Sequence, residues 1–334
     1  MYRLLVVLVV VALAWSVYWA IASAGASKGI EVWFADRQKE GWVAEYDDLS
    51  VQGYPYRFDT TFSKVEIADP DTGVAWNAPS FQIFALSYKP NHLIAVWPKL
   101  QRIATPLDKY QIASEDMRAS IVSAPSTSLA IERLTLTSGA IAITPDASGQ
   151  PSTADKLTVA AERLDGSESA YRLGIAADGL SPALEWRVKL DPSGSLPERF
   201  DALKADATVE FSKPWDISAL EDARPQPKRI DLSLVEARWG RLELQAAGQV
   251  DIDKAGVPEG EIVIKARNWR EILRLGVESG ALTEGLAGSI EDGLSLISQL
   301  SGNPKTLDIP LNFRRGRVLL GPVPIAAAPV LSIR

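Results

Sequence analysis

The feature that most constrains the fold of this chain is an uncharged apolar stretch, Leu4–Ala22. As a helix rising ~1.5 Å per residue, it would span roughly 28 Å, about the thickness of one hydrocarbon core. Valine is a weak helix former in water, but lipid offers no hydrogen-bond partners, so a spanning segment must satisfy its backbone internally as a helix. We therefore expect a transmembrane helix at Leu4–Ala22.

The residues that flank this stretch predict its orientation. Arg3 and the α-amine lie on the near side, while Trp15 and Trp19 gather with Tyr18 toward the far end, where amphipathic rings favour the headgroup layer. The positive-inside tendency then makes residues 1–3 a cytoplasmic stub and exports the rest of the chain.

A cleaved signal peptide is the alternative, because Ala22-Ser23-Ala24 has the small-x-small pattern of a cleavage site. The apolar stretch is longer than the usual signal-peptide core, and bulky aromatic residues crowd the approach to that site. We favour a retained signal anchor, although Lys28 adds one positive charge on the exported side.

Composition excludes several classes of function. The chain has 334 residues, a net charge of -7, no cysteine and a single histidine, His92. These numbers exclude a disulfide framework and a cysteine nucleophile, and the negative charge argues against nucleic acid as a partner. The lack of cysteine and of glycosylation sequons favours a Gram-negative periplasm. We thus expect a single-pass protein of the bacterial inner membrane, with a cytoplasmic N-terminus and a periplasmic bulk.

After the anchor the periodicity changes twice. Ile30, Trp33 and Phe34 form an apolar stripe at helical spacing, which predicts a juxtamembrane helix within residues 23–46, stopped near Gly41. Residues 47–334 then alternate with period two between Gly, Pro, Asp and Asn clusters, as strands and hairpins do.

At least ten short strands follow from this alternation. The strand predictions are Phe81–Leu86, Leu93–Trp97, Leu129–Thr137, Ala140–Ile143, Leu157–Ala161, Tyr171–Ile175, Leu184–Leu190, Ala207–Phe211, Ile230–Leu234, Arg241–Ala246, Gln249–Ile252, Glu261–Ala266, Leu307–Phe313 and Arg317–Leu320. Their short connections predict a mainly β fold: an elongated, curved, mostly antiparallel sheet, groove-like or sandwich-like. The stretches Thr144–Thr153 and Ala223–Pro227 are interpreted as hairpin loops within one periplasmic β domain.

A helical insert is expected at about residues 269–301. Apolar residues recur there every three or four positions, at Leu282, Leu286, Ile290, Leu294 and Ile297. Five glycines lower the intrinsic helicity, each by roughly 1 kcal/mol relative to alanine. We expect one or two helices, broken near Gly280 and packed on the sheet.

No motif carries recognisable chemistry. Asp251–Gly256 begins like a calcium loop, but Ala255 and Ile262 occupy positions that need ligands, so a turn with a positive φ at Gly256 is favoured. Asp69–Gly73 is likewise interpreted as a turn. His92 is expected on an exposed turn at Lys89–Asn91, with no nucleophile beside it. We expect no catalytic, cofactor-binding or metal-binding residue.

Aromatic residues are concentrated near the anchor. The run comprises Trp42, Tyr46, Tyr54, Tyr56, Phe58, Phe62, Trp76, Phe81, Phe84, Tyr88 and Trp97. An ordinary core close to the membrane is the favoured interpretation, since Trp and Tyr also anchor at bilayer interfaces. An apolar groove mouth beside the bilayer is the alternative.

Three stretches carry a family resemblance. They are Gly41–Pro55 with Gly53–Phe58 and Trp76–Pro79, then Gly248–Gly260, and finally Ile309–Arg314 with Gly316–Pro324 and Pro329. Together they resemble an uncharacterised, membrane-anchored bacterial family, domain of unknown function 2125, over nearly the whole chain after the anchor. The strand–Gly–strand pattern more distantly resembles AsmA- and TamB-like envelope proteins. That resemblance implies a curved β-groove and a part in moving phospholipid, although this chain is too short to bridge a periplasm.

Three functional hypotheses remain. The first is a non-enzymatic protein, anchored in the inner membrane through Leu4–Ala22, whose apolar sheet face binds phospholipid or another hydrophobic ligand in envelope maintenance. The second is a structural module that docks envelope protein partners along an edge strand. The third is an envelope glycan or lipid hydrolase that uses an Asp/Glu pair.

Overall fold

The computed structural model describes residues 2–221, 223–301, 306–321 and 323–333. Met1 of the predicted stub and Pro322 of the third family-like stretch lie outside the described residues. The chain divides into two compact units: Met1–Pro125 with Ile143–Gly149, and Ser126–Ala142 with Gln150–Arg334. One boundary falls inside Thr144–Thr153, the stretch interpreted from sequence as a hairpin loop. Each unit is described by itself.

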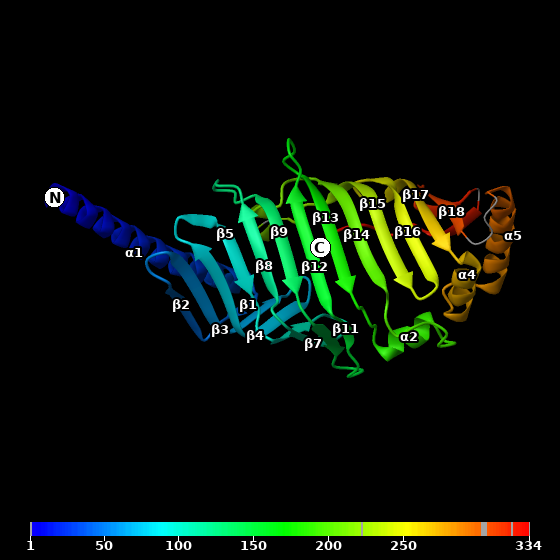
Figure 1. Cartoon of the computed structure of the whole chain (residues 1–334), viewed down its shortest axis with the longest axis horizontal. Helices are drawn as coiled ribbons and strands as arrows, with labels where there is room; N and C mark the ends of the chain where they lie inside the picture. The colour runs from blue at the N-terminus through cyan, green and yellow to red at the C-terminus, as the bar shows by residue number, and fades with distance from the viewer. Residues whose placement is uncertain (1, 222, 302–305, 322, 334) are drawn as a thin grey trace. The chain divides into compact units, whose positions relative to one another are not determined.

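A single long helix opens unit 1. Helix α1 runs without interruption from Tyr2 to Lys39, and its N-terminal part projects beyond the strands (Figure 1). It is long and apolar enough to span a membrane. The prediction of a separate juxtamembrane helix at 23–46 is therefore wrong in its bounds. Gly25 and Gly29 stay helical, and the chain turns only at Gly41, where φ is +90°.

The strands of unit 1 form an antiparallel arrangement around one long hairpin, β3 and β4, whose thirteen-residue strands pair along their lengths. Strands β1 and β2 pair with β3, β5 and β6 pair with β4, and β8 and β7 follow them outward. Strand β10 pairs with β7, and of its residues Ile143–Pro145 belong to unit 1. The bounds are β1 Val43–Glu45, β2 Asp48–Gln52, β3 Arg57–Asp69, β4 Val74–Leu86, β5 Lys89–Val96, β6 Leu100–Ala104, β7 Lys109–Ser114, β8 Arg118–Ser123 and β10 Ile141–Pro145.

The aromatic run supplies much of the core of unit 1. Phe62 of β3 is buried beside Phe34 of α1, with Tyr46, Trp76 and Phe81 packed around them. The Phe34 and Tyr46 rings meet edge to face with centroids 4.8 Å apart, a geometry that aromatic pairs favour. For these residues the interpretation as an ordinary core is confirmed.

The strands of unit 2 are antiparallel, and each pairs with the next in the order β9, β12, β13, β14, β15, β16, β17, β18, β19 and β20. Figure 1 shows β12 to β17 side by side. The strand bounds are β9 Ile131–Ser138, β11 Ser152–Ala154, β12 Lys156–Arg163, β13 Ala170–Asp178, β14 Ala202–Phe211, β15 Pro227–Trp239, β16 Leu242–Ile252, β17 Pro258–Arg267, β18 Thr306–Arg314, β19 Arg317–Leu320 and β20 Val323–Ala327. The helix bounds are α2 Leu184–Leu190, α3 Ser218–Glu221, α4 Trp269–Glu278 and α5 Glu284–Ser301.

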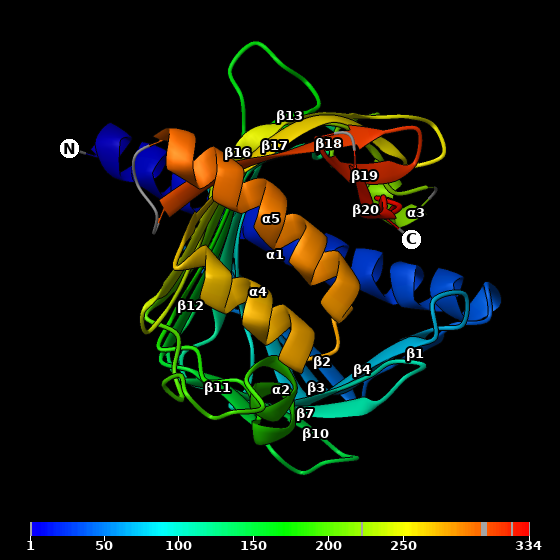
Figure 2. The same cartoon turned by 90° about the vertical axis from the view of Figure 1, so that its right-hand side faces the viewer.

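The helical insert is confirmed as two helices with a break around Gly280, where φ is +75°. Helices α4 and α5 lie side by side at the β16–β18 end of the sheet (Figure 2). Trp269, Ile290 and Leu294 are buried against Ala266 and Leu307 of that end. The side chain of Ile297, which was expected on the same stripe, lies outside the described residues.

Three local predictions are wrong. The expected strand Leu184–Leu190 is helix α2, and Arg241–Ala246 and Gln249–Ile252 belong to one strand, β16. The expected turn at Lys89–Asn91 lies inside β5, because the hairpin turns two residues earlier. The alternating pattern of Leu184–Leu190 predicts a strand, but the edge of β13 with which this strand would pair is already paired with β14. The mainly β, antiparallel, open-sheet fold with C-terminal helices is confirmed.

We predict that Phe34→Ala loosens α1 from the unit 1 sheet. Phe34 is 7% exposed, so the truncation should cost about 3–5 kcal/mol of unfolding free energy. Val32→Ala on the same helix is the control, because Val32 is 47% exposed and should change little. Denaturant unfolding of the detergent-solubilised full chain measures both, and equal effects would contradict the packing described here.

Candidate functional site

The sheet of unit 2 carries two continuous rows of apolar side chains that cross eight strands. Residues directly opposite each other in neighbouring strands point to the same face, so the pairing register alone places them in line. We name these two rows together the apolar track. The first row is Leu136, Val159, Ile175, Ala205, Val235, Ala246, Ile264 and Ile309, and the second is Leu134, Ala161, Leu173, Ala207, Leu232, Gly248, Ile262 and Leu311.

The apolar track is only partly covered by the described residues: Leu173 and Ala207 pack against one buried cluster and Ile309 against another. None of its members is fully buried, and Ile175 at its middle is 48% exposed. With strands ~4.8 Å apart, eight strands make the track roughly 34 Å long. A continuous apolar surface of this length on a water-exposed face is more often a binding surface than an accident of exposure.

The opposite face of the same strands carries polar rows, and the row between them includes Leu234, Ala247 and Val263. One of the polar rows is Thr137, Thr158, Ala176, Lys204, Glu236, Gln245, Lys265 and Asp308. The sheet therefore has one face suited to water and one that loses free energy in contact with it.

Rows with buried members border the track on both sides. On one side Ala177, Ala266 and Leu307 are buried, the last two beneath α4 and α5. On the other side Tyr171 and Val209 are buried with Phe211, and Trp215 and Ile333 pack against them. The track is thus a partly exposed strip between two packed margins.

An apolar cavity of about 290 Å³ opens at one margin. Its lining consists of Leu190, Phe200, Ala237, Trp239, Leu242, Leu244, Ile272, Leu275, Gly276 and Ser279. Ala237 and Leu244 lie two residues along their strands from Val235 and Ala246 of the track. The cavity therefore extends the apolar surface sideways beneath α4.

One wall of this cavity depends on the loop that follows α2. The Asp191 carboxylate accepts hydrogen bonds from the Leu196 amide at 2.7 Å and from the Ser193 hydroxyl at 2.7 Å. Burial by itself would raise the pKa of Asp191, but these hydrogen bonds outweigh it and hold the pKa below its ordinary value. Pro197 then accepts a hydrogen bond from the Trp239 indole at 2.7 Å, which ties the loop to the cavity.

The C-terminal tail fixes the opposite margin. The Leu331 amide donates to the Gly256 carbonyl at 2.8 Å, and Gln226 exchanges two hydrogen bonds with the Ile333 backbone. Gly256 has φ +81°, and a Cβ there would lie 2.9 Å from Val330. This glycine is needed both for its turn and for the close approach of the tail.

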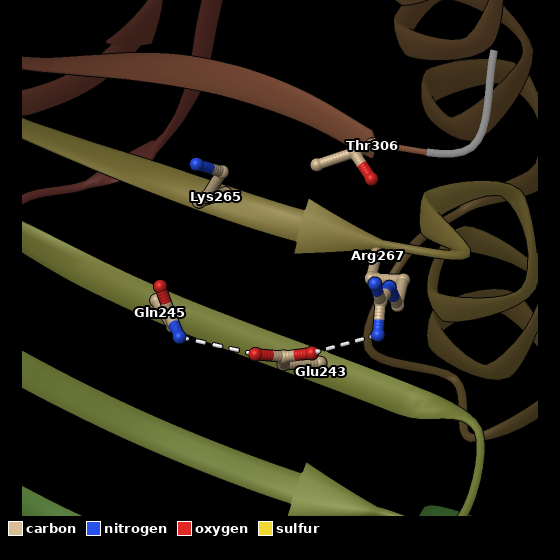
Figure 3. Close-up of a pocket in the computed structure, with 5 residues that line it drawn as sticks. All are labelled: Glu243, Gln245, Lys265, Arg267 and Thr306. Atoms are coloured by element: carbon tan, nitrogen blue, oxygen red, sulfur yellow. Dashed lines mark hydrogen bonds and ion pairs between the residues drawn. The ribbon is translucent and has the colours of Figure 1, made fainter. Parts of the chain in front are cut away.

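A polar pocket of about 230 Å³ lies on the other face of β16 and β17 (Figure 3). Gln245 and Arg267 both donate to the Glu243 carboxylate, at 3.0 and 3.4 Å, with Lys265 and Thr306 alongside. The Arg267 side chain is 63% exposed, so this is a solvated ion pair of small energetic weight. The pocket offers no enclosed acid–base pair.

The motifs considered from sequence prove to be local structure. Asp253 accepts hydrogen bonds from the amides of Ala255 and Val257, as a turn-forming aspartate does, and Asp69 does the same for Asp71. Among the described residues there is no group of three His, Asp or Glu that could hold a metal ion. His92 lies in β5 with its Nε2 2.8 Å from the Ser120 hydroxyl, so its expected place on a turn is wrong.

The model of one protein family, described as an uncharacterised protein conserved in bacteria (DUF2125), matches residues 19–329. The chain belongs to the DUF2125 family. The region matched by the DUF2125 model includes most of both units, whereas most of the apolar stretch precedes it. No curated protein and no solved structure matches this DUF2125 chain.

We predict that Asp191→Asn destabilises the loop at the cavity wall by about 1–3 kcal/mol at neutral pH, because charge-assisted hydrogen bonds are lost. The folded pKa of Asp191 is lowered, so its contribution is complete above the ordinary value of about 3.9 and is lost as the pH falls through the folded pKa. Hydrogen exchange at the Leu196 amide measures this. A difference between variant and wild type that persists unchanged at low pH would contradict the assignment.

We predict that Gly256→Ala releases the tail. The control is Gly166→Ala, because Gly166 has a similar φ of +77° and a Cβ added to it would meet no other atom within 4 Å. Both variants carry the same backbone strain of about 1 kcal/mol or more, so only the clash with the tail separates them. Amide exchange at Leu331 should accelerate in the first variant alone.

Proposed function

We propose that this protein is a non-enzymatic, membrane-anchored binder of hydrophobic ligands, with lipid acyl chains as the ligand class, acting in maintenance of the bacterial envelope. The observation that supports this most is the apolar track, a double row of unburied aliphatic side chains across eight strands. With the anchor in an inner membrane and both units in the periplasm, the protein lies next to a supply of such lipids.

The energetics favour an apolar occupant. Each methylene group that leaves water contributes about 0.8 kcal/mol, so an extended chain laid along the track gains several kcal/mol before ordering costs. Small side chains, Ala205, Ala207 and Gly248, lie in the middle of the rows and leave room for it. The distant AsmA-like resemblance implies the same ligand class.

The ionisable groups support a role without catalysis. A general acid needs a raised pKa, yet among the described carboxyl groups every clear displacement is downward. The Arg241 hydrogen bond lowers the pKa of Glu271, and the Arg172 hydrogen bond lowers that of Asp206. These carboxylates are structural ion-pair partners, which gives an Asp/Glu hydrolase no support.

The test is co-purification of lipid with the full chain from bacterial membranes in mild detergent, read by native mass spectrometry. Ile175→Asp places a charge in the middle of the track, and we expect a several-fold loss of bound phospholipid. Val263→Asp is the matched control, because Val263 is 36% exposed on the opposite face of the same sheet. Equal lipid content in both variants, or none in the wild type, would contradict the proposal.

A second candidate function is a protein-interaction module. It is favoured by α2, whose four apolar side chains are exposed: Leu184 at 49%, Trp186 at 51%, Val188 at 53% and Leu190 at 44%. A partner helix or strand that covers them would bury a substantial apolar area. In vivo crosslinking from position 186 distinguishes the two candidate functions. A protein adduct that still forms at this position in the Ile175→Asp variant supports the protein-interaction module.

A further inference from the structure

Two turns at one end of unit 1 contact the membrane-spanning part of α1. They are the β2–β3 loop, Gly53–Arg57, and the β4–β5 turn, Ser87–Lys89, which we name together the tips. The tips are joined to each other, since the Ser87 hydroxyl donates to the Pro55 carbonyl at 3.0 Å and the Ser87 amide donates to the Tyr56 carbonyl at 2.9 Å. They therefore move as one body.

Helix side chains bond directly to the backbone of the tips. The Trp15 indole donates to Pro55 at 2.9 Å, the Tyr18 hydroxyl to Ser87 at 2.6 Å and the Trp19 indole to Arg57 at 2.9 Å. Trp19 also stacks on Phe58 and meets Tyr54 edge to face, with ring centroids 5.9 and 5.5 Å away. These contacts set the position of the tips along the helix.

Along α1, the tips contact residues that come before the end of the apolar stretch Leu4–Ala22 and therefore lie on its membrane side. Trp15 precedes Ala22 by seven residues and Trp19 precedes it by three, which corresponds to about 10 Å and 5 Å along the helix. With Leu4–Ala22 crossing the hydrocarbon core, the tips are held within the outer part of the same bilayer. Raising the helix until the tips clear the lipid would leave Tyr2–Ala14, about 20 Å, to cross a core of ~30 Å.

The side chains of the tips suit this depth. Tyr54, Tyr56 and Tyr88 are 56%, 68% and 65% exposed, and no described strand covers them. Tyrosine is enriched where a ring enters the acyl boundary and its hydroxyl stays among headgroups. Lys89 flanks the rings and is exposed, as groups that reach lipid phosphates are, whereas Arg57 is exposed but pairs with Asp59 at 2.6 Å.

We propose that the tips form a second membrane contact, inserted into the headgroup and upper acyl layer of the leaflet through which α1 leaves the bilayer. The partner is the lipid surface itself, engaged by Tyr56 and Tyr88, whereas the Tyr54 hydroxyl bonds to Ser16 of α1 at 2.7 Å. Unit 1 is then seated on the membrane by a helix and two turns at once. This contact does not depend on what the apolar track binds.

The chain contains no cysteine, so a single introduced cysteine is a unique label site. The experiment labels Tyr56→Cys and Tyr88→Cys with an environment-sensitive fluorophore in the full chain. The labelled protein is reconstituted into phosphatidylethanolamine–phosphatidylglycerol vesicles, with and without nitroxide-labelled lipid as quencher. We expect a blue-shifted emission at both sites and several-fold stronger quenching than at a water-exposed site.

Two controls complete the comparison. Leu107→Cys reports water, because Leu107 is 95% exposed at the other end of the β3–β4 hairpin, roughly 40 Å of strand away. Val9→Cys reports lipid, because Val9 lies within the apolar stretch and is 51% exposed. Quenching at positions 56 and 88 equal to that at 107, with position 9 quenched, would overturn the proposal.

Discussion

Antiparallel pairing in register is the constraint on which the rest of unit 2 depends. Alternation within each strand only divides its residues between two faces, and it is the alignment of neighbours that joins aliphatic residues into a surface. Val159, Ile175 and Ala205 lie in three different strands, yet they stand opposite one another. In seven of the eight strands, a shift of one residue in either direction would interrupt the track with a polar side chain.

Most of the helices and strands could be predicted from the sequence, whereas the alignment of neighbouring strands could not. The apolar N-terminal helix, most strands and the break in the helical insert follow from local chemistry, because periodicity, glycine and hydrophobicity act over short distances. The apolar track could not be predicted, because register is a property of pairs of strands far apart in sequence. The strand predicted at Leu184–Leu190 shows the same limit, since alternation there has no open edge to pair with.

The aromatic residues that follow the apolar stretch have two different roles in unit 1. Phe62, Phe81 and Trp76 are core residues of unit 1, whereas Tyr56 and Tyr88 are exposed at its turns. From sequence, the alternatives for the whole run are an ordinary core and an apolar groove mouth beside the bilayer. The structure divides the run by position along the β3–β4 hairpin, with the core at its middle and the exposed tyrosines in the tips.

A β-bulge in β15 determines which residues of this strand lie on the face of the apolar track. Between Leu232 and Val235, β15 holds one residue more than either neighbour. That extra residue reverses the parity of the strand, so Val235, Ala237 and Trp239 share a face with Leu232. Strict alternation from Leu232 would instead have placed Glu236 and Arg238 there. Loss of Ser233 or Leu234 would therefore remove the bulge and leave a regular strand, with Val235, Ala237 and Trp239 still on the face of Leu232.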